Sequence, residues 1–190
     1  MAPLAIIWHV VFYGMLIALV AGWRPSARFI MAALALPVLS VGVVAWLFGN
    51  PFNGTIFILL SILTAIFGCR GGRKNVTFGS HWKQISGWLM IIFGLMYPHF
   101  LHASSPVSYL YKSPLGLIPC PTLSAVIGLA LILDNIKSRA WHIVLLIGGF
   151  IYGFIGAFVL GVTIDLILLA GAVLLATKLI SDARSGIAYG

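Results

Sequence analysis

The chain has 190 residues, of which 62% are hydrophobic and only 7% charged, and it carries eleven Lys and Arg against three acidic residues. A water-soluble surface needs about a quarter to a third of its residues charged, which this chain cannot supply. The composition therefore excludes a soluble enzyme, a disordered tail and a nucleic-acid-binding domain, although a net charge of +8 would favour phosphate binding in a soluble protein. We expect an all-α, polytopic transmembrane helical bundle that forms a single domain over residues 1–190.

Seven apolar stretches approach the length of about 20 residues that a helix needs to cross a bilayer. In chain order they cover residues 4–22, 29–48, 52–68, 85–101, 119–133, 141–161 and 164–178. Only Gly161-Val162-Thr163 separates the last two stretches. The sequence therefore predicts seven spans, with six spans and one long bent helix as the alternative.

The basic residues favour seven spans. With the N-terminus outside, alternating loops place ten of the eleven basic residues on the inner side and leave only Lys112 outside, as the positive-inside rule requires. The inner residues are Arg24, Arg28, Arg70, Arg73, Lys74, Lys83, Lys137, Arg139, Lys178 and Arg184. We expect an N-terminus outside, a cytoplasmic C-terminus and a location in a cell membrane, with a bacterial inner membrane as the expected one.

Several polar residues gather toward the outer side of this topology, and ionisable residues inside a bilayer are costly and usually functional. Five of them lie near the outer ends of their helices: His9, His99, His102, Cys120 and Asp165. Asn50 and Asn53 flank the outer turn between the second and third stretches. We therefore predict one polar vestibule that opens to the outer face and binds a ligand or ion.

Three of these residues, Cys120, His99 and His102, predict a soft-metal site. Thiolate and imidazole are ligands for such metals, and histidines three residues apart share a helix face. The alternatives are histidines that contact lipid headgroups and a cysteine that packs as a small apolar residue. A haem would need His9 to face His99 or His102 across the bundle, and the residues do not identify a cofactor.

Asp165 opens the last apolar stretch and has two interpretations. Its carboxylate either caps the helix N-terminus, where free N–H groups and the helix dipole stabilise an anion, or forms a proton or cation site. The other two acids, Asp134 and Asp182, lie close in sequence to Arg139 and Arg184. We expect these two to be solvated charges at the membrane interface.

Two prolines, Pro119 and Pro121, flank Cys120 at the start of the fifth stretch. Proline fixes φ and removes a backbone N–H, so the segment predicts a rigid helix start. The alternative is an interrupted helix entry whose free carbonyls and thiol line a cavity, which is tolerated at membrane depth only where protein or water covers the backbone.

Small residues recur every four positions in the sixth stretch, where they allow another backbone to approach closely. They are Gly149, Gly153, Ala157 and Gly161. Helix packing within the chain is one explanation. A homo-oligomer, or docking of a partner subunit on this face, is the other.

From Tyr97-Pro98 onward the chain resembles a family of small bacterial integral membrane proteins, the domain of unknown function DUF6064. The resemblance rests on Ser113-Pro114-Leu115-Gly116, on Pro119-Cys120-Pro121-Thr122 with Gly128, and on Gly161-Val162-x-x-Asp165 followed by Leu168 and Leu169. It covers about the C-terminal half of the chain. The family implies a multi-span helical membrane protein and no activity.

These observations leave three hypotheses. The first is transport of a small solute or ion through the outer vestibule, with Asp165 as the proton or cation carrier. The second is a metal- or haem-binding membrane subunit of a redox complex, and the third is a structural subunit of a larger membrane assembly. No catalytic motif, neither a phosphate loop nor a nucleophile elbow nor a zinc helix, supports an enzyme, and the lipid bilayer is the one partner that the composition predicts.

Overall fold

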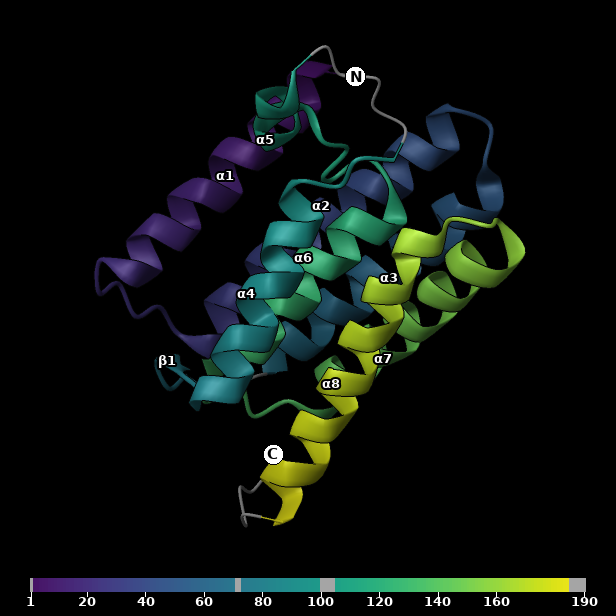
Figure 1. Ribbon diagram of the computed structural model, residues 1–190. Coiled ribbons are helices and arrows are strands. Elements are labelled where there is room, and N and C mark those ends of the chain that lie inside the picture. The colour runs from purple at the N-terminus through teal and green to yellow at the C-terminus, as the bar shows by residue number, and fades with distance from the viewer. Residues whose placement is uncertain (1, 71–72, 100–104, 185–190) are drawn as a thin grey trace.

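The computed structural model describes residues 2–70, 73–99 and 105–184, and within them the chain is an all-α bundle (Figure 1). The long helices are α1 (Ala2–Val20), α2 (Ala27–Leu47), α3 (Pro51–Arg70), α4 (His81–Leu95), α6 (Pro119–Ile132), α7 (Arg139–Phe154) and α8 (Leu166–Arg184). Each predicted apolar stretch overlaps one of these helices, but the fourth, 85–101, is helical only as far as Leu95 within the described residues. The predicted all-α class is confirmed.

Short elements connect the long helices. They are β1 (Thr77–Phe78), the 3-10 turn η1 (Pro106–Ser108), α5 (Tyr109–Lys112), β2 (Leu133–Asp134), the π-helical segment η2 (Ile155–Val159) and the 3-10 turn η3 (Thr163–Asp165). The segments η2 and η3 join α7 to α8. The predicted reversal near Gly161 is thus present, and Gly161 itself has a φ of +70° that favours glycine.

Five helices in the described part of the chain are long and apolar enough to cross a membrane. They comprise α1, α2, α3, α7 together with η2, and η3 together with α8. The helix α6 is apolar but shorter, with 14 residues, and α4 has 15. These are the helices of a membrane protein, while seven spans and the orientation in the membrane stay predictions.

Consecutive long helices run in alternating directions, so α1 begins at one end of the bundle and α8 finishes at the other (Figure 1). Loops far apart in sequence meet at the end where α8 finishes. The backbone N–H of Ala27 donates to the carbonyl of Lys74 at 2.9 Å, and β1 pairs with β2. We call this end, formed by residues 21–28, 73–83, 133–139 and 178–184, the basic end.

The helix α6 forms the centre of the bundle and packs against α2, α4, α7 and α8. Every residue from Pro121 to Ile132 is buried, which explains why this helix is apolar on all sides. Glycines allow α4 to approach it closely. A Cβ atom on Gly87 would lie 2.5 Å from the carbonyl oxygen of Gly128, and one on Gly128 would lie 2.7 Å from that of Gly87.

Two residues of the predicted small-residue face pack within the chain. A Cβ atom on Gly149 would lie 2.7 Å from Ile127 of α6, and one on Gly153 would lie 2.7 Å from the backbone nitrogen of Leu169 in α8. Beyond them the π-helical segment changes the helical register, leaving Ala157 half-buried and Gly161 exposed. A partner on this face stays a prediction.

Candidate functional site

A cavity of about 320 Å³ lies at the end of the bundle opposite the basic end. We call it the polar cavity. The α2–α3 turn, the chain after α4, the start of α6, the end of α7 and the turns η2 and η3 contribute to it. Its lining residues are Asn50, Phe52, Asn53, Tyr97, Ile118, Pro119, Cys120, Tyr152, Ile155, Gly156, Leu160, Val162 and Asp165. The volume lies in the range of small-molecule sites.

The Asp165 carboxylate lies in the wall of the polar cavity and is 2% exposed. The hydroxyl of Tyr97 donates to Oδ1 at 2.7 Å, and the thiol of Cys120 donates to Oδ2 at 3.1 Å. Among the described residues, both hydrogen-bond partners of the carboxylate are therefore neutral side chains from other elements. Among the described residues the donors to this carboxylate are side chains, and because Asp165 directly precedes Leu166 at the start of α8, stabilisation by the helix dipole stays a prediction.

A glycine brings the α7–α8 connection against this carboxylate. Gly156 belongs to the π-helical segment η2, and a Cβ atom there would collide with Oδ2 of Asp165. A π-helical turn inserts one residue into a helix and is frequent at functional sites. Because of this turn, the small residue that lies against Asp165 is Gly156 and not Ala157, which belongs to the predicted small-residue face.

A second polar pair lines the cavity. The hydroxyl of Tyr152 donates to Oδ1 of Asn53 at 3.0 Å, and the Tyr152 ring packs edge-on against Phe57 at 5.0 Å. The backbone N–H of Asn53 in turn donates to Oδ1 of Asn50 at 3.0 Å, which caps the start of α3. The sequence analysis placed Asn50 and Asn53 at this end but missed Tyr152.

The Pro-Cys-Pro segment is a rigid helix start. The helix α6 begins at Pro119, and the hydroxyl of Thr122 donates to the carbonyl of Ile118 at 2.8 Å while accepting the N–H of Gly116 at 2.8 Å. The Ile118 carbonyl is therefore bonded within the chain. The alternative, an interrupted helix entry, predicted that free carbonyls and the Cys120 thiol line a cavity. Cys120 does line the polar cavity.

The predicted histidines occupy different places. His9 is 1% exposed and does not belong to the cavity lining; its Nδ1 lies 2.8 Å from the carbonyl oxygen of Ala5 and its Nε2 3.1 Å from that of Leu95. His99 is half-buried, with its ring 6.4 Å from that of Tyr97. His102 lies outside the described residues.

The predicted site is thus brought together in part. Cys120 and Asp165 are in contact, and His9 is apart from them. Among the described residues, no three His, Cys, Asp or Glu side chains are grouped so that they could hold a metal ion. Because His102 falls outside those residues, the predicted set of Cys120, His99 and His102 stays a prediction.

The other two acids form a buried network at the basic end. Lys83 lies 3.0 Å from Asp134 and 2.8 Å from Asp182, and Lys178 lies 3.3 Å from Asp134. Lys178 also donates to the carbonyl of Leu133 at 2.6 Å. The prediction of solvated interface charges was wrong for Asp182, because Asp182 and Lys178 are four residues apart on the buried face of α8 and are 6% and 2% exposed. Asp134 is half-buried, with 28% of its side chain exposed, and is ion-paired.

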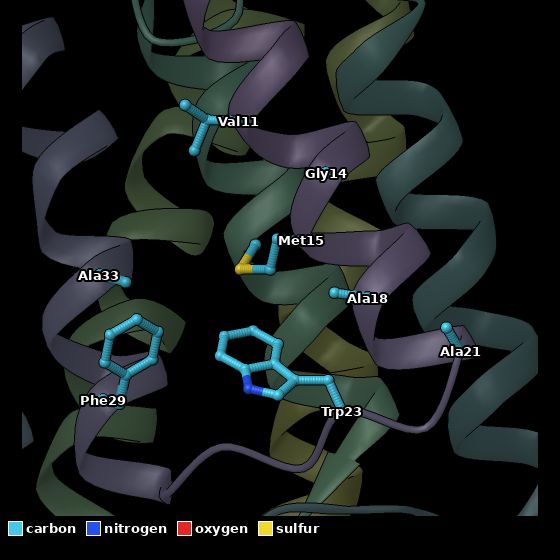
Figure 2. Close-up of a pocket in the computed structure, with 8 residues that line it drawn as sticks. All are labelled: Val11, Gly14, Met15, Ala18, Ala21, Trp23, Phe29 and Ala33. Atoms are coloured by element: carbon cyan, nitrogen blue, oxygen red, sulfur yellow. The ribbon is translucent and has the colours of Figure 1, made fainter.

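A larger hollow, of about 670 Å³, lies between α1 and α2. Figure 2 shows its lining, with small residues of α1 on one side and the rings of Trp23 and Phe29 at one end. These two rings meet edge-on at 5.5 Å. No ionisable residue belongs to the lining given for this hollow, so its chemistry is that of a lipid-facing surface.

The chain matches no family model, and neither a curated protein nor a solved structure matches it. The resemblance to DUF6064 therefore stays a prediction. The site has to be interpreted from its own geometry.

Proposed function

We propose that the protein binds a proton or a small cation at Asp165 in the polar cavity and carries it across the membrane. One observation supports this most: a carboxylate that is 2% exposed borders a cavity, and its hydrogen-bond partners Tyr97 and Cys120 are neutral. A buried charge without a countercharge is expensive unless a cation or proton neutralises it. The two hydrogen bonds stabilise the anion between binding events.

The surroundings of the site support transport. The helices α7 and α8 are joined by π-helical and 3-10 turns at the depth of Asp165, and α6 is short. Interrupted and short helices are typical of transporter sites at membrane depth. Under the positive-inside rule the basic end faces the cytoplasm, so the polar cavity opens toward the outer side.

The residues behind the DUF6064 resemblance favour the same place. Cys120 of the Pro-Cys-Pro segment and Asp165 of the Gly-Val-x-x-Asp segment are 45 positions apart in the chain and share a hydrogen bond. We therefore include membership of that family in the proposal and assign the family's two distinctive elements to the cation site.

Flux into proteoliposomes tests the proposal. Purified protein is reconstituted into vesicles that contain a pH-sensitive dye, and proton entry is driven by a potassium diffusion potential set with valinomycin. Parallel vesicles carry a sodium-sensitive dye and receive a Na⁺ gradient. We expect wild-type protein to conduct one of these ions and Asp165→Asn to reduce that rate at least about tenfold, since the buried countercharge is removed.

Thr177→Val provides the matched control, because it removes a polar group from the exposed face of α8, the helix that follows Asp165. Within the described residues the Thr177 hydroxyl donates to the carbonyl of Val173 in its own helix. The flux through this variant should equal the wild-type flux. Equal flux through wild-type and Asp165→Asn vesicles, or flux no higher than in empty vesicles for both ions, contradicts the proposal.

A further inference from the structure

Most of the polar side chains in the lining of the polar cavity leave acceptors, rather than donors, for a ligand. The hydroxyl protons of Tyr97 and Tyr152 and the thiol proton of Cys120 are all donated to Asp165 or Asn53. Each of these groups therefore presents lone pairs to the cavity. The side-chain amides of Asn53 and the exposed Asn50 are the remaining donors of the lining. A ligand that satisfies this cavity must itself carry N–H or O–H donors.

The charge of the cavity is negative. Asp165 is the one acid in the lining, and the described lining residues include no Lys, Arg or His. The cavity is poorly suited to a bare Ca²⁺ ion, which takes about six to eight oxygen ligands, because its lining supplies a single carboxylate. Positive charge with donors of its own suits it better.

Most of the remaining wall is apolar. Phe52, Ile118, Ile155, Leu160 and Val162 line the cavity. Two aromatic rings, those of the tyrosines, complete it. Aromatic faces attract ammonium groups, and a mostly apolar wall with a few placed polar groups is typical of sites for small organic ligands.

From these features we infer that the polar cavity takes an organic ammonium ion: an amine with a small apolar body, its N–H groups directed to Asp165 and the tyrosine oxygens, its body against the apolar wall. This inference rests on the proposed function, because it names the class of cation that Asp165 binds. The ammonium ion then shares Asp165 with the proton or Na⁺ that the flux test follows, which distinguishes the site from one that handles only protons or alkali ions.

Calorimetric titration with benzylammonium chloride tests the inference on the full chain in a nonionic detergent. Benzyl alcohol, which is similar in size and neutral, controls for partition into the micelle and into the hollow between α1 and α2. We expect saturable benzylammonium binding that weakens at least about tenfold in Asp165→Asn, because the substitution removes one partner of a buried charge pair. Benzyl alcohol should show no such dependence on Asp165.

A second variant protects the test against misfolding. Leu160 is 67% exposed at the cavity, so Leu160→Trp should fold, fill space needed by the amine's body and weaken benzylammonium binding. Flux on the same preparations separates the two claims. Asp165-dependent flux without benzylammonium binding overturns this inference alone, and so does binding that is equal in Asp165→Asn. Absence of both overturns the proposed function as well.

Discussion

The two ends of the bundle each bury acidic side chains, but they neutralise them differently. At the basic end Asp134 and Asp182 meet Lys83 and Lys178 at 2.8–3.3 Å, so two negative charges face two positive ones. At the opposite end Asp165 meets only the neutral donors of Tyr97 and Cys120 among its described partners, beside an open volume of about 320 Å³.

Under our proposal, this difference distinguishes a structural network at the basic end from a cation-binding site at Asp165. A chain of three ion pairs links α4, β2 and α8, and breaking a buried pair by removing one partner is strongly destabilising. A carboxylate beside a cavity lacks a permanent countercharge and depends on a mobile one. Substitutions at the basic end should therefore reduce stability, whereas substitutions at Asp165 should reduce cation handling.

Lys178→Met gives the largest expected loss. It removes the cation that bonds Asp134 and the carbonyls of Ala130 and Leu133, and it leaves two acids for the single remaining Lys83. We expect the free energy of unfolding, measured in mixed detergent micelles, to fall by about 3–5 kcal/mol. The double variant Lys178→Met/Asp134→Asn keeps the Lys83–Asp182 ion pair, whose net charge is zero, and should recover part of the lost stability. If the free energy of unfolding of Lys178→Met equalled that of the wild type, the network would not stabilise the fold.

Gly156→Ala should have an intermediate effect. The new methyl group collides with Oδ2 of Asp165, and such overpacking costs about 1–3 kcal/mol. Gly14→Ala is the matched control, since nothing lies within 4 Å of a Cβ atom built there. Unfolding in the same micelles should distinguish the two, and equal stability of both variants would mean that the π-helical segment does not press on the carboxylate.

Tyr97→Phe should cost less, about 1–2 kcal/mol, because one buried acceptor of Asp165 loses its donor while the Cys120 thiol still donates to the other oxygen. Tyr13→Phe removes a hydroxyl that donates to the carbonyl of Leu110 at an exposed position, and it should cost less than Tyr97→Phe. Ion flux should also fall in Tyr97→Phe and not in Tyr13→Phe. A larger loss of stability in Tyr13→Phe than in Tyr97→Phe would show that the hydrogen bond to Asp165 contributes no more than an exposed one.

Much of the fold follows from composition and charge. The seven apolar stretches overlap helices, and the run of basic residues at alternate loops gathers at one end because successive helices reverse direction. The same alternation explains why Cys120 and Asp165, distant in sequence, could be placed at the same end. Two features were not predictable: the end of α4 at Leu95 and the π-helical segment at 155–159. Both depend on packing, and a uniformly apolar sequence has no hydrophobic periodicity that would indicate them.

The rest of the site had weaker signals. Tyr97 follows the end of α4 and Tyr152 lies near the end of α7, both within apolar stretches of the sequence, so no pattern indicated where their hydroxyls point. The network at the basic end had a usable signal, since Lys178 and Asp182 are four positions apart on one helix. His9 had none: its ring bonds to a carbonyl of α4, Leu95, that is 86 positions away.

The most direct test of the account compares the same isosteric substitution at the two ends, Asp165→Asn and Asp182→Asn, by free energy of unfolding and by cation flux. The amide oxygen that Asp165→Asn introduces still accepts the Tyr97 hydroxyl, so we expect a change in stability below about 1 kcal/mol with flux reduced at least about tenfold. Asp182→Asn should lose more stability, because its buried bond to Lys83 is charged, and should keep flux in the molecules that remain folded. A large loss of stability in Asp165→Asn with unchanged flux would contradict the account.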